Sequence, residues 1–110
     1  MDRLRRICLS LPEAYEKETW DSATFRVRQK IFCMGGHDPL APSVSMKATR
    51  EDQRAMLAQG DPFFLPAYVG HKGWIGVKLA GPLVDWEEIA ELVTESYRLV
   101  APKRLSAGLP

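Results

Sequence analysis

Hydrophobic and polar residues alternate along three short segments of the chain, as they do in β-strands that are buried on one side only. The apolar positions are Phe25 and Val27, Val44 and Met46, and Ile75, Val77 and Leu79. The other positions are Arg26 and Arg28, Ser43, Ser45 and Lys47, and Trp74, Gly76 and Lys78. An antiparallel sheet that is covered by helices on one face and open to solvent on the other produces this pattern.

Apolar residues spaced three or four apart indicate helices around these strands. A short apolar stripe predicts a helix over Asp2–Ser10, and Pro12 ends it. Thr49 begins a second helix that runs to about Gln59, where Gly60 suits the C-cap.

The last predicted helix begins at Asp85, whose side chain suits the N-cap, and ends before Pro102. One face of this helix is apolar and consists of Trp86, Ile89, Ala90, Val93, Tyr97 and Val100. We expect this face to pack on the sheet, with Trp86 buried.

The remaining segments complete an α+β fold of two layers, with an antiparallel sheet and helices packed on one face. Ala14–Trp20 is a further strand, and Thr24–Arg28 and Ile31–Met34 form a hairpin. Asp61-Pro62 suggests the start of a short helical turn, and Pro66–Gly73 a loop or a short strand with a turn. We expect a single domain over residues 1–110.

Composition narrows the classes of function. The chain has 110 residues, a net charge of +1 and a pI near 7.8, whereas dedicated nucleic-acid binders are usually more basic. Only local clustering of charge would therefore support nucleic-acid binding. Cys8 and Cys33 are too few for a disulfide framework and are predicted to be buried thiols. The sequence shows no signal peptide and no membrane-spanning run, so we expect a cytoplasmic protein with no membrane contact.

No set of residues suggests catalysis or metal binding. Cys33 and His37 have a spacing that would suit two metal ligands, but zinc sites need three or four, and His71 is the only other histidine. Cys33 has no accompanying catalytic signature. We therefore expect no metal, no cofactor and no enzymatic activity.

Several runs of sequence carry a family resemblance. The shorter ones are Leu11-Pro12-Glu13-Ala14, Thr24-Phe25-Arg26-Val27-Arg28, Lys30-Ile31-Phe32 and Val44-Ser45-Met46-Lys47. The longer ones are Tyr68-Val69-Gly70-His71-Lys72-Gly73-Trp74 and Ser96-Tyr97-Arg98-Leu99-Val100-Ala101-Pro102-Lys103-Arg104. Together these runs resemble the MmcQ/YjbR family of small bacterial proteins. The resemblance implies a fold similar to that of secretion chaperones, with the order α-β3-α-β2-α, and DNA binding through a proposed double-wing motif.

Two basic turns fit the two wings physically. One is Arg28-Gln29-Lys30, although Gln29 stands where glycine is more typical of the family, and a turn that needs positive φ suits glycine better. The other is Gly70-His71-Lys72-Gly73, whose glycines would let the backbone approach a phosphate. The predicted nucleic-acid-binding residues are Arg26, Arg28, Lys30, Lys47, His71, Lys72, Trp74 and Lys78.

Other interpretations of these residues stay open. The charges can simply keep an open sheet soluble and protect its edges, and Trp74 can either stack on a base or pack under a loop. The leading hypothesis is DNA binding through phosphates. The alternative is a module that docks a protein partner on the same sheet face. A third hypothesis is a small-molecule pocket near Tyr68, His71 and Trp74.

Overall fold

The computed structural model describes residues 2–19, 22–36, 38, 40–81 and 84–109 of the chain. The first half contains α1 (Asp2–Leu9), β1 (Tyr15–Thr19), β2 (Ser22–Val27), β3 (Lys30–Gly35), β4 (Ser43–Met46) and α2 (Arg50–Gln59). The second half contains β5 (Phe63–Phe64), the 3₁₀ helix η1 (Gly70–Lys72), β6 (Ile75–Lys78), α3 (Trp86–Val100) and α4 (Lys103–Ser106).

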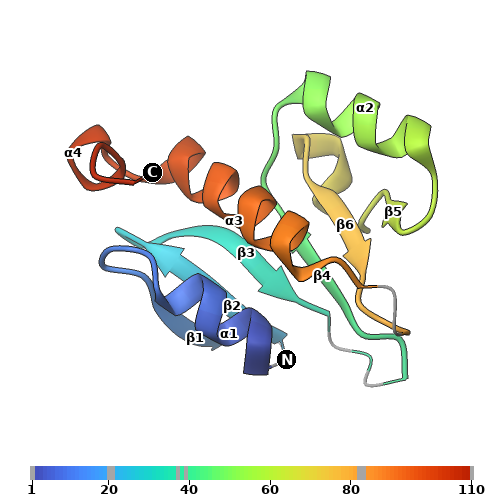
Figure 1. Cartoon of the computed structure of the whole chain (residues 1–110), viewed down its shortest axis with the longest axis horizontal. Helices are drawn as coiled ribbons and strands as arrows, with labels where there is room; N and C mark the ends of the chain where they lie inside the picture. The colour runs from blue at the N-terminus through green and yellow to red at the C-terminus, as the bar shows by residue number, and fades with distance from the viewer. Residues whose placement is uncertain (1, 20–21, 37, 39, 82–83, 110) are drawn as a thin grey trace.

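The strands form one six-stranded antiparallel sheet in the order β1-β2-β3-β4-β6-β5. The helices α1 and α3 lie on one face of this sheet, and α2 lies beside β5 and β6 (Figure 1). The predicted α+β class is therefore confirmed. The strand predicted over Ala14–Trp20 is confirmed as β1, which pairs with β2 along its whole length, so four strands precede α2 and not the three of the order that the resemblance implied.

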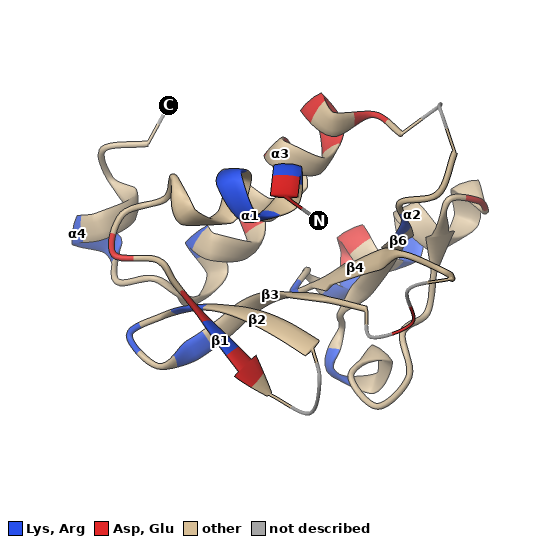
Figure 2. Cartoon of the chain, turned by 90° about the horizontal axis from the view of Figure 1, so that it is seen from below, with Lys and Arg blue, Asp and Glu red and all other residues tan. Residues whose placement is uncertain are grey.

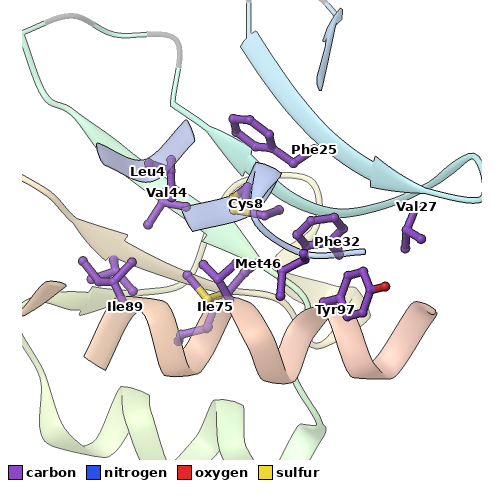
Figure 3. Packing of buried hydrophobic residues seen from close by; sticks show 14 of the residues in the cluster. Leu4, Cys8, Phe25, Val27, Phe32, Val44, Met46, Ile75, Ile89 and Tyr97 are labelled. Atoms are coloured by element: carbon purple, nitrogen blue, oxygen red, sulfur yellow. The ribbon is translucent and has the colours of Figure 1, made fainter. Parts of the chain in front are cut away.

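A β-bulge in β3 places two successive side chains in the core. The pairs Phe25–Cys33 and Arg26–Ile31 leave Phe32 without an opposite residue on β2, as is typical of a bulge. Phe32 and Cys33 are both fully buried, whereas regular alternation would turn one of them outward. The Phe32 ring meets the edge of the Tyr97 ring of α3 at 5.5 Å between centroids (Figure 3).

The predicted helix caps are confirmed. The Thr49 side chain accepts a hydrogen bond from the Asp52 amide, and the Asp85 side chain accepts one from the Glu88 amide. The prediction for Trp86 was wrong: it is only half buried, and the guanidinium of Arg3 lies 5.4 Å above its ring. Trp86 is the first residue of α3 and packs against the core while part of its side chain stays exposed.

Two further local predictions were wrong. Asp61-Pro62 leads into strand β5, because Phe63 and Phe64 pair with Val77 and Gly76 at the edge of the sheet. A short helix, α4, follows Pro102, where the sequence analysis expected only an end. Both segments are too short for periodicity to identify, and their structure depends on contacts with other elements.

The turn between β2 and β3 contains a residue that glycine would replace favourably. Arg28 and Gln29 both have positive φ, 49° and 70°, which is the conformation of a type I′ hairpin turn. The left-handed region costs a residue with a Cβ about 1–2 kcal/mol, part of which glycine recovers. We expect Gln29→Gly to raise the free energy of unfolding by about 0.5–1 kcal/mol in urea denaturation. Unchanged or lower stability would contradict this assignment of the turn.

Candidate nucleic-acid interface

The β2–β3 turn projects from one end of the sheet and holds two of the predicted binding residues. Arg28 makes a two-pronged ion pair with Glu13, with Nε 2.9 Å from Oε1 and Nη2 3.3 Å from Oε2. Lys30 begins β3 and is exposed. The turn is thus a hairpin tip, as predicted, but the charge of Arg28 is shared with a carboxylate from the segment before β1.

The second predicted turn is not a tight β-turn. Gly70-His71-Lys72 forms the 3₁₀ helix η1, within the long connection Leu65–Trp74 that joins β5 to β6. The conformation of the connection itself requires both glycines. Gly73 has a positive φ of 94°, and a Cβ on Gly70 would lie 2.8 Å from the Leu65 side chain. The glycines shape this connection and are themselves buried, while His71 and Lys72 are exposed.

Two residues of α2 hold the Leu65–Trp74 connection in place. The buried amide of Gln53 donates hydrogen bonds of 2.8 Å to the carbonyl oxygens of both Gly70 and Trp74. Arg50 donates another to the carbonyl oxygen of His71. These bonds come from a helix that is about 20 residues away in sequence, and they fix where His71 and Lys72 lie. Nothing in the local sequence indicates them.

Cationic residues from several segments lie at one end of the sheet. β2 ends and β3 begins there, and β4 ends and β6 begins there, as the pairs Val27–Lys30 and Met46–Ile75 show. We call this region the basic end of the sheet, and it comprises Arg28, Lys30, Lys47, Arg50 and Lys72. Figure 2 shows basic residues at the β2–β3 turn, with those of α4 on the same side of the molecule. The composition alone did not reveal that these cations share one end of the sheet.

The remaining predicted residues lie elsewhere or have other contacts. Arg26 lies on the outer face but donates hydrogen bonds to the hydroxyls of Thr24 and Thr19, at 3.1 and 2.9 Å. Lys78 lies at the opposite end of the sheet, 2.7 Å from a carboxylate oxygen of Asp61. Lys47 follows the last residue of β4 and lines a groove of about 80 Å³ between α2 and α3. The outer face therefore contributes less than predicted.

Trp74, one of the predicted binding residues, has the alternative role considered for it and packs under a loop. It is only 7% exposed, because the chain folds back over this position: the Trp74 amide donates to the carbonyl oxygen of Val69, and Gln53 binds its carbonyl oxygen. The outer face beside it is also covered, since a Cβ on Gly76 would lie 2.4 Å from the Phe64 ring. Trp74 packs within the protein and offers no surface to a base.

Tyr68 is an exposed aromatic residue that was not among the predicted binding residues. It lies in the Leu65–Trp74 connection, two residues before η1, and is 92% exposed. Its φ of 67° is unusual for a residue with a ring. Leu65, in the same connection, is 59% exposed. The sequence shows that the Tyr68–Trp74 run begins with a tyrosine, but no local pattern indicates that its ring is exposed.

The two thiols are buried, as predicted. Burial raises the pKa of the Cys33 thiol well above its usual value, and the neighbouring Cys8 thiol adds to this, which suits a structural rather than a nucleophilic cysteine. Within the part of the chain that the structure describes, no three His, Cys, Asp or Glu residues are grouped so as to hold a metal ion. His37 lies outside the described residues.

Among the described helices, none has the length and apolar character required to cross a bilayer. The fold is similar to that of two solved structures. The crystal structure of Deinococcus radiodurans protein DR2400, with a DUF419 domain, has a TM-score of 0.81 and 24% identity, covering 99% of this chain and 88% of that one. A Pseudomonas syringae protein has a TM-score of 0.71 and 21% identity, covering 92% of this chain and all of that one.

No curated protein matches the chain significantly. The YjbR family model matches residues 9–99, which include the whole sheet, the β2–β3 turn and the connection before β6. The sequence runs that suggested the resemblance lie within this range, apart from residues 100–104 of the last one. On the family match and the shared fold together, the chain belongs to the YjbR family.

Proposed function

We propose that this protein binds nucleic acid through phosphate contacts at the basic end of its sheet. The observation that carries the proposal is that cations from separate segments share one end of the sheet: Lys30 from a hairpin tip, Lys47 from the end of β4, and Lys72 from the connection before β6. Phosphate oxygens attract such cations, and lysines bind them as point charges. We propose a binding role for the protein and assign no catalytic residue.

The charge distribution limits the strength and the specificity of this binding. A net charge of +1 gives little long-range attraction, and the Arg28–Glu13 ion pair offsets one of the cations. Phosphate contacts carry no sequence information in themselves. We therefore expect weak, salt-sensitive affinity for duplex DNA that depends little on its sequence.

The salt dependence of duplex binding tests this proposal. With Arg28 paired to Glu13, three phosphate contacts, one each for Lys30, Lys47 and Lys72, give a slope of log K against log salt of about −2.7. Lys30→Gln with Lys72→Gln removes two contacts, so we expect the slope to flatten to about −0.9. The measurement is fluorescence anisotropy with a labelled duplex over a series of salt concentrations.

A matched double variant removes the same charge elsewhere. Lys17→Gln with Lys78→Gln alters the outer face of β1 and the opposite end of β6, and should leave the slope near that of the unaltered protein. Equal flattening by both pairs would show that only net charge matters. Negligible duplex binding by the folded protein even at about 20 mM salt would overturn the proposal and favour a protein partner on this surface.

A further inference from the structure

An exposed aromatic ring lies in the same connection as Lys72, one of the cations that would contact phosphates. Tyr68 is 92% exposed, and the connection that carries it continues directly into η1 with its exposed His71 and Lys72. Solvent-exposed tyrosine is common, but a ring so fully exposed contributes almost nothing to the core. The ring is therefore available to a ligand.

The backbone at Tyr68 reinforces this point. Its φ of 67° lies in the left-handed region, which disfavours residues with a Cβ and is least costly for glycine and asparagine. Residues that keep such a conformation without a packing role are enriched at functional sites. Tyr68 thus combines a conformational cost with no burial in return.

The connection is also held rigidly enough to present the ring. Gln53 binds the carbonyl oxygens of Gly70 and Trp74, and Arg50 binds that of His71. The Gly70 amide donates to the carbonyl oxygen of Pro66 at 3.0 Å, which closes the chain around Tyr68. A ring on a fixed backbone loses little conformational entropy when a flat partner stacks on it.

The charges near the connection are mixed in sign. Lys72 lies in η1 and Arg50 binds the carbonyl oxygen of His71, while Glu51 and Asp52 in the first turn of α2 offset their positive charge. Electrostatic attraction at this site is therefore modest, and stacking has to supply a share of the binding. Single-stranded nucleic-acid sites combine a cationic surface with an aromatic side chain in this way.

We propose that Tyr68 is a stacking platform for an unpaired base, so that the protein binds single strands in preference to duplexes. The proposal rests on the proposed nucleic-acid binding and specifies its ligand. In a duplex the bases are stacked on one another and their faces are closed to a side chain, whereas a single strand can place a base on the ring while Lys72 contacts a neighbouring phosphate.

Anisotropy with a labelled 20-nucleotide single strand and its duplex tests this inference. We expect the single strand to bind more tightly, and Tyr68→Ala to weaken single-strand binding by about 5- to 100-fold while changing duplex binding by less than about twofold. Tyr68→Phe should keep the affinity, because stacking requires the ring and not the hydroxyl. Leu40→Ala removes an equally exposed apolar side chain, 93% exposed, and should change nothing.

Tyr68→Asn separates stacking from folding. Asparagine tolerates the left-handed region, so we expect this variant to lose single-strand affinity like Tyr68→Ala while its Tm rises by roughly 2–5 °C. A parallel loss of affinity and Tm would instead assign Tyr68 a structural role and overturn the inference.

The remaining outcomes distinguish the two proposals. If single strand and duplex bind equally and Tyr68→Ala has no effect, phosphate binding stands and the stacking platform is wrong. If neither binds at low salt, both proposals fail, and the exposed Leu65 and Tyr68 become candidates for a protein contact.

Discussion

Replacing Phe32 by alanine is expected to lower the free energy of unfolding by about 3–5 kcal/mol. Phe32 is completely buried on the helix side of the sheet, and its ring meets Tyr97 edge to face at 5.5 Å. Truncation removes this aromatic contact and leaves a cavity where β3 meets α3 (Figure 3). The loss is a large part of the roughly 5–15 kcal/mol that stabilises a domain, so thermal and urea denaturation should both reveal it.

The neighbouring residue provides the control for this prediction. Ile31 pairs with Arg26 on the outer face and is half exposed, so Ile31→Ala should cost only about 1 kcal/mol. In a strand without the bulge, the positions would be reversed, with Ile31 facing inward like Cys33 and Phe32 facing solvent. A larger loss from Ile31→Ala than from Phe32→Ala would therefore rule out the bulge.

Gln53→Glu is expected to cost about 2–4 kcal/mol at neutral pH, although the two side chains have nearly the same shape. The Gln53 amide is 6% exposed and donates to the carbonyl oxygens of Gly70 and Trp74. A carboxylate has no hydrogen to donate, so the substitution leaves both oxygens without these donors and adds a buried negative charge beside them. The same change should loosen the connection that carries Tyr68.

The pH dependence of this variant identifies the cause. Burial and the two facing oxygens should raise the pKa of the introduced carboxyl in the folded protein above its value of about 4.3 in the unfolded chain. The folded state then binds the proton more tightly, so the stability deficit should be smallest near pH 4 and should grow as the pH rises through the folded-state pKa. Denaturation midpoints at several pH values measure this trend.

Gln59→Glu is the matched control, because Gln59 is an exposed residue at the end of the same helix. It should cost below about 1 kcal/mol, mainly through the unfavourable negative charge at a helix C-terminus, and its deficit should not grow with pH in the same way. If Gln53→Glu were as mild as this control, the two hydrogen bonds of Gln53 would not hold the connection before β6.

The sequence by itself determined the parts of the fold that depend on local order. The alternation around Phe25, Val44 and Ile75 located three strands and the inward face of each, because side chains in a strand alternate with a period of two. Asp85 and Thr49 identified helix starts, because an N-cap satisfies amides only three residues away. The Arg28-Gln29 turn was likewise readable, since its geometry depends on adjacent residues.

For the candidate site, the sequence identified several of the cations, but it did not indicate which residues each cation contacts in the folded protein. Lys30 and Lys72 were correctly expected to be exposed near turns. Nothing local indicated that Arg28 would meet Glu13, that Lys78 would meet Asp61, or that the other cations would share one end of the sheet. These relations join residues that are far apart along the chain, and a one-dimensional pattern carries no such information.

Only the tertiary structure decided between the two aromatic residues of the Tyr68–Trp74 run. Trp74 occupies a position where alternation predicted exposure, yet the folded connection and Gln53 bury it. Tyr68 has no periodic signal, and the same connection leaves its ring in solvent. The bulge at Phe32 has a similar origin, since the register of β2 and β3 shifts so that both Phe32 and Cys33 fill the core. The alternation in the sequence indicates which face of a strand is apolar, whereas packing against distant elements decides which side chains are buried.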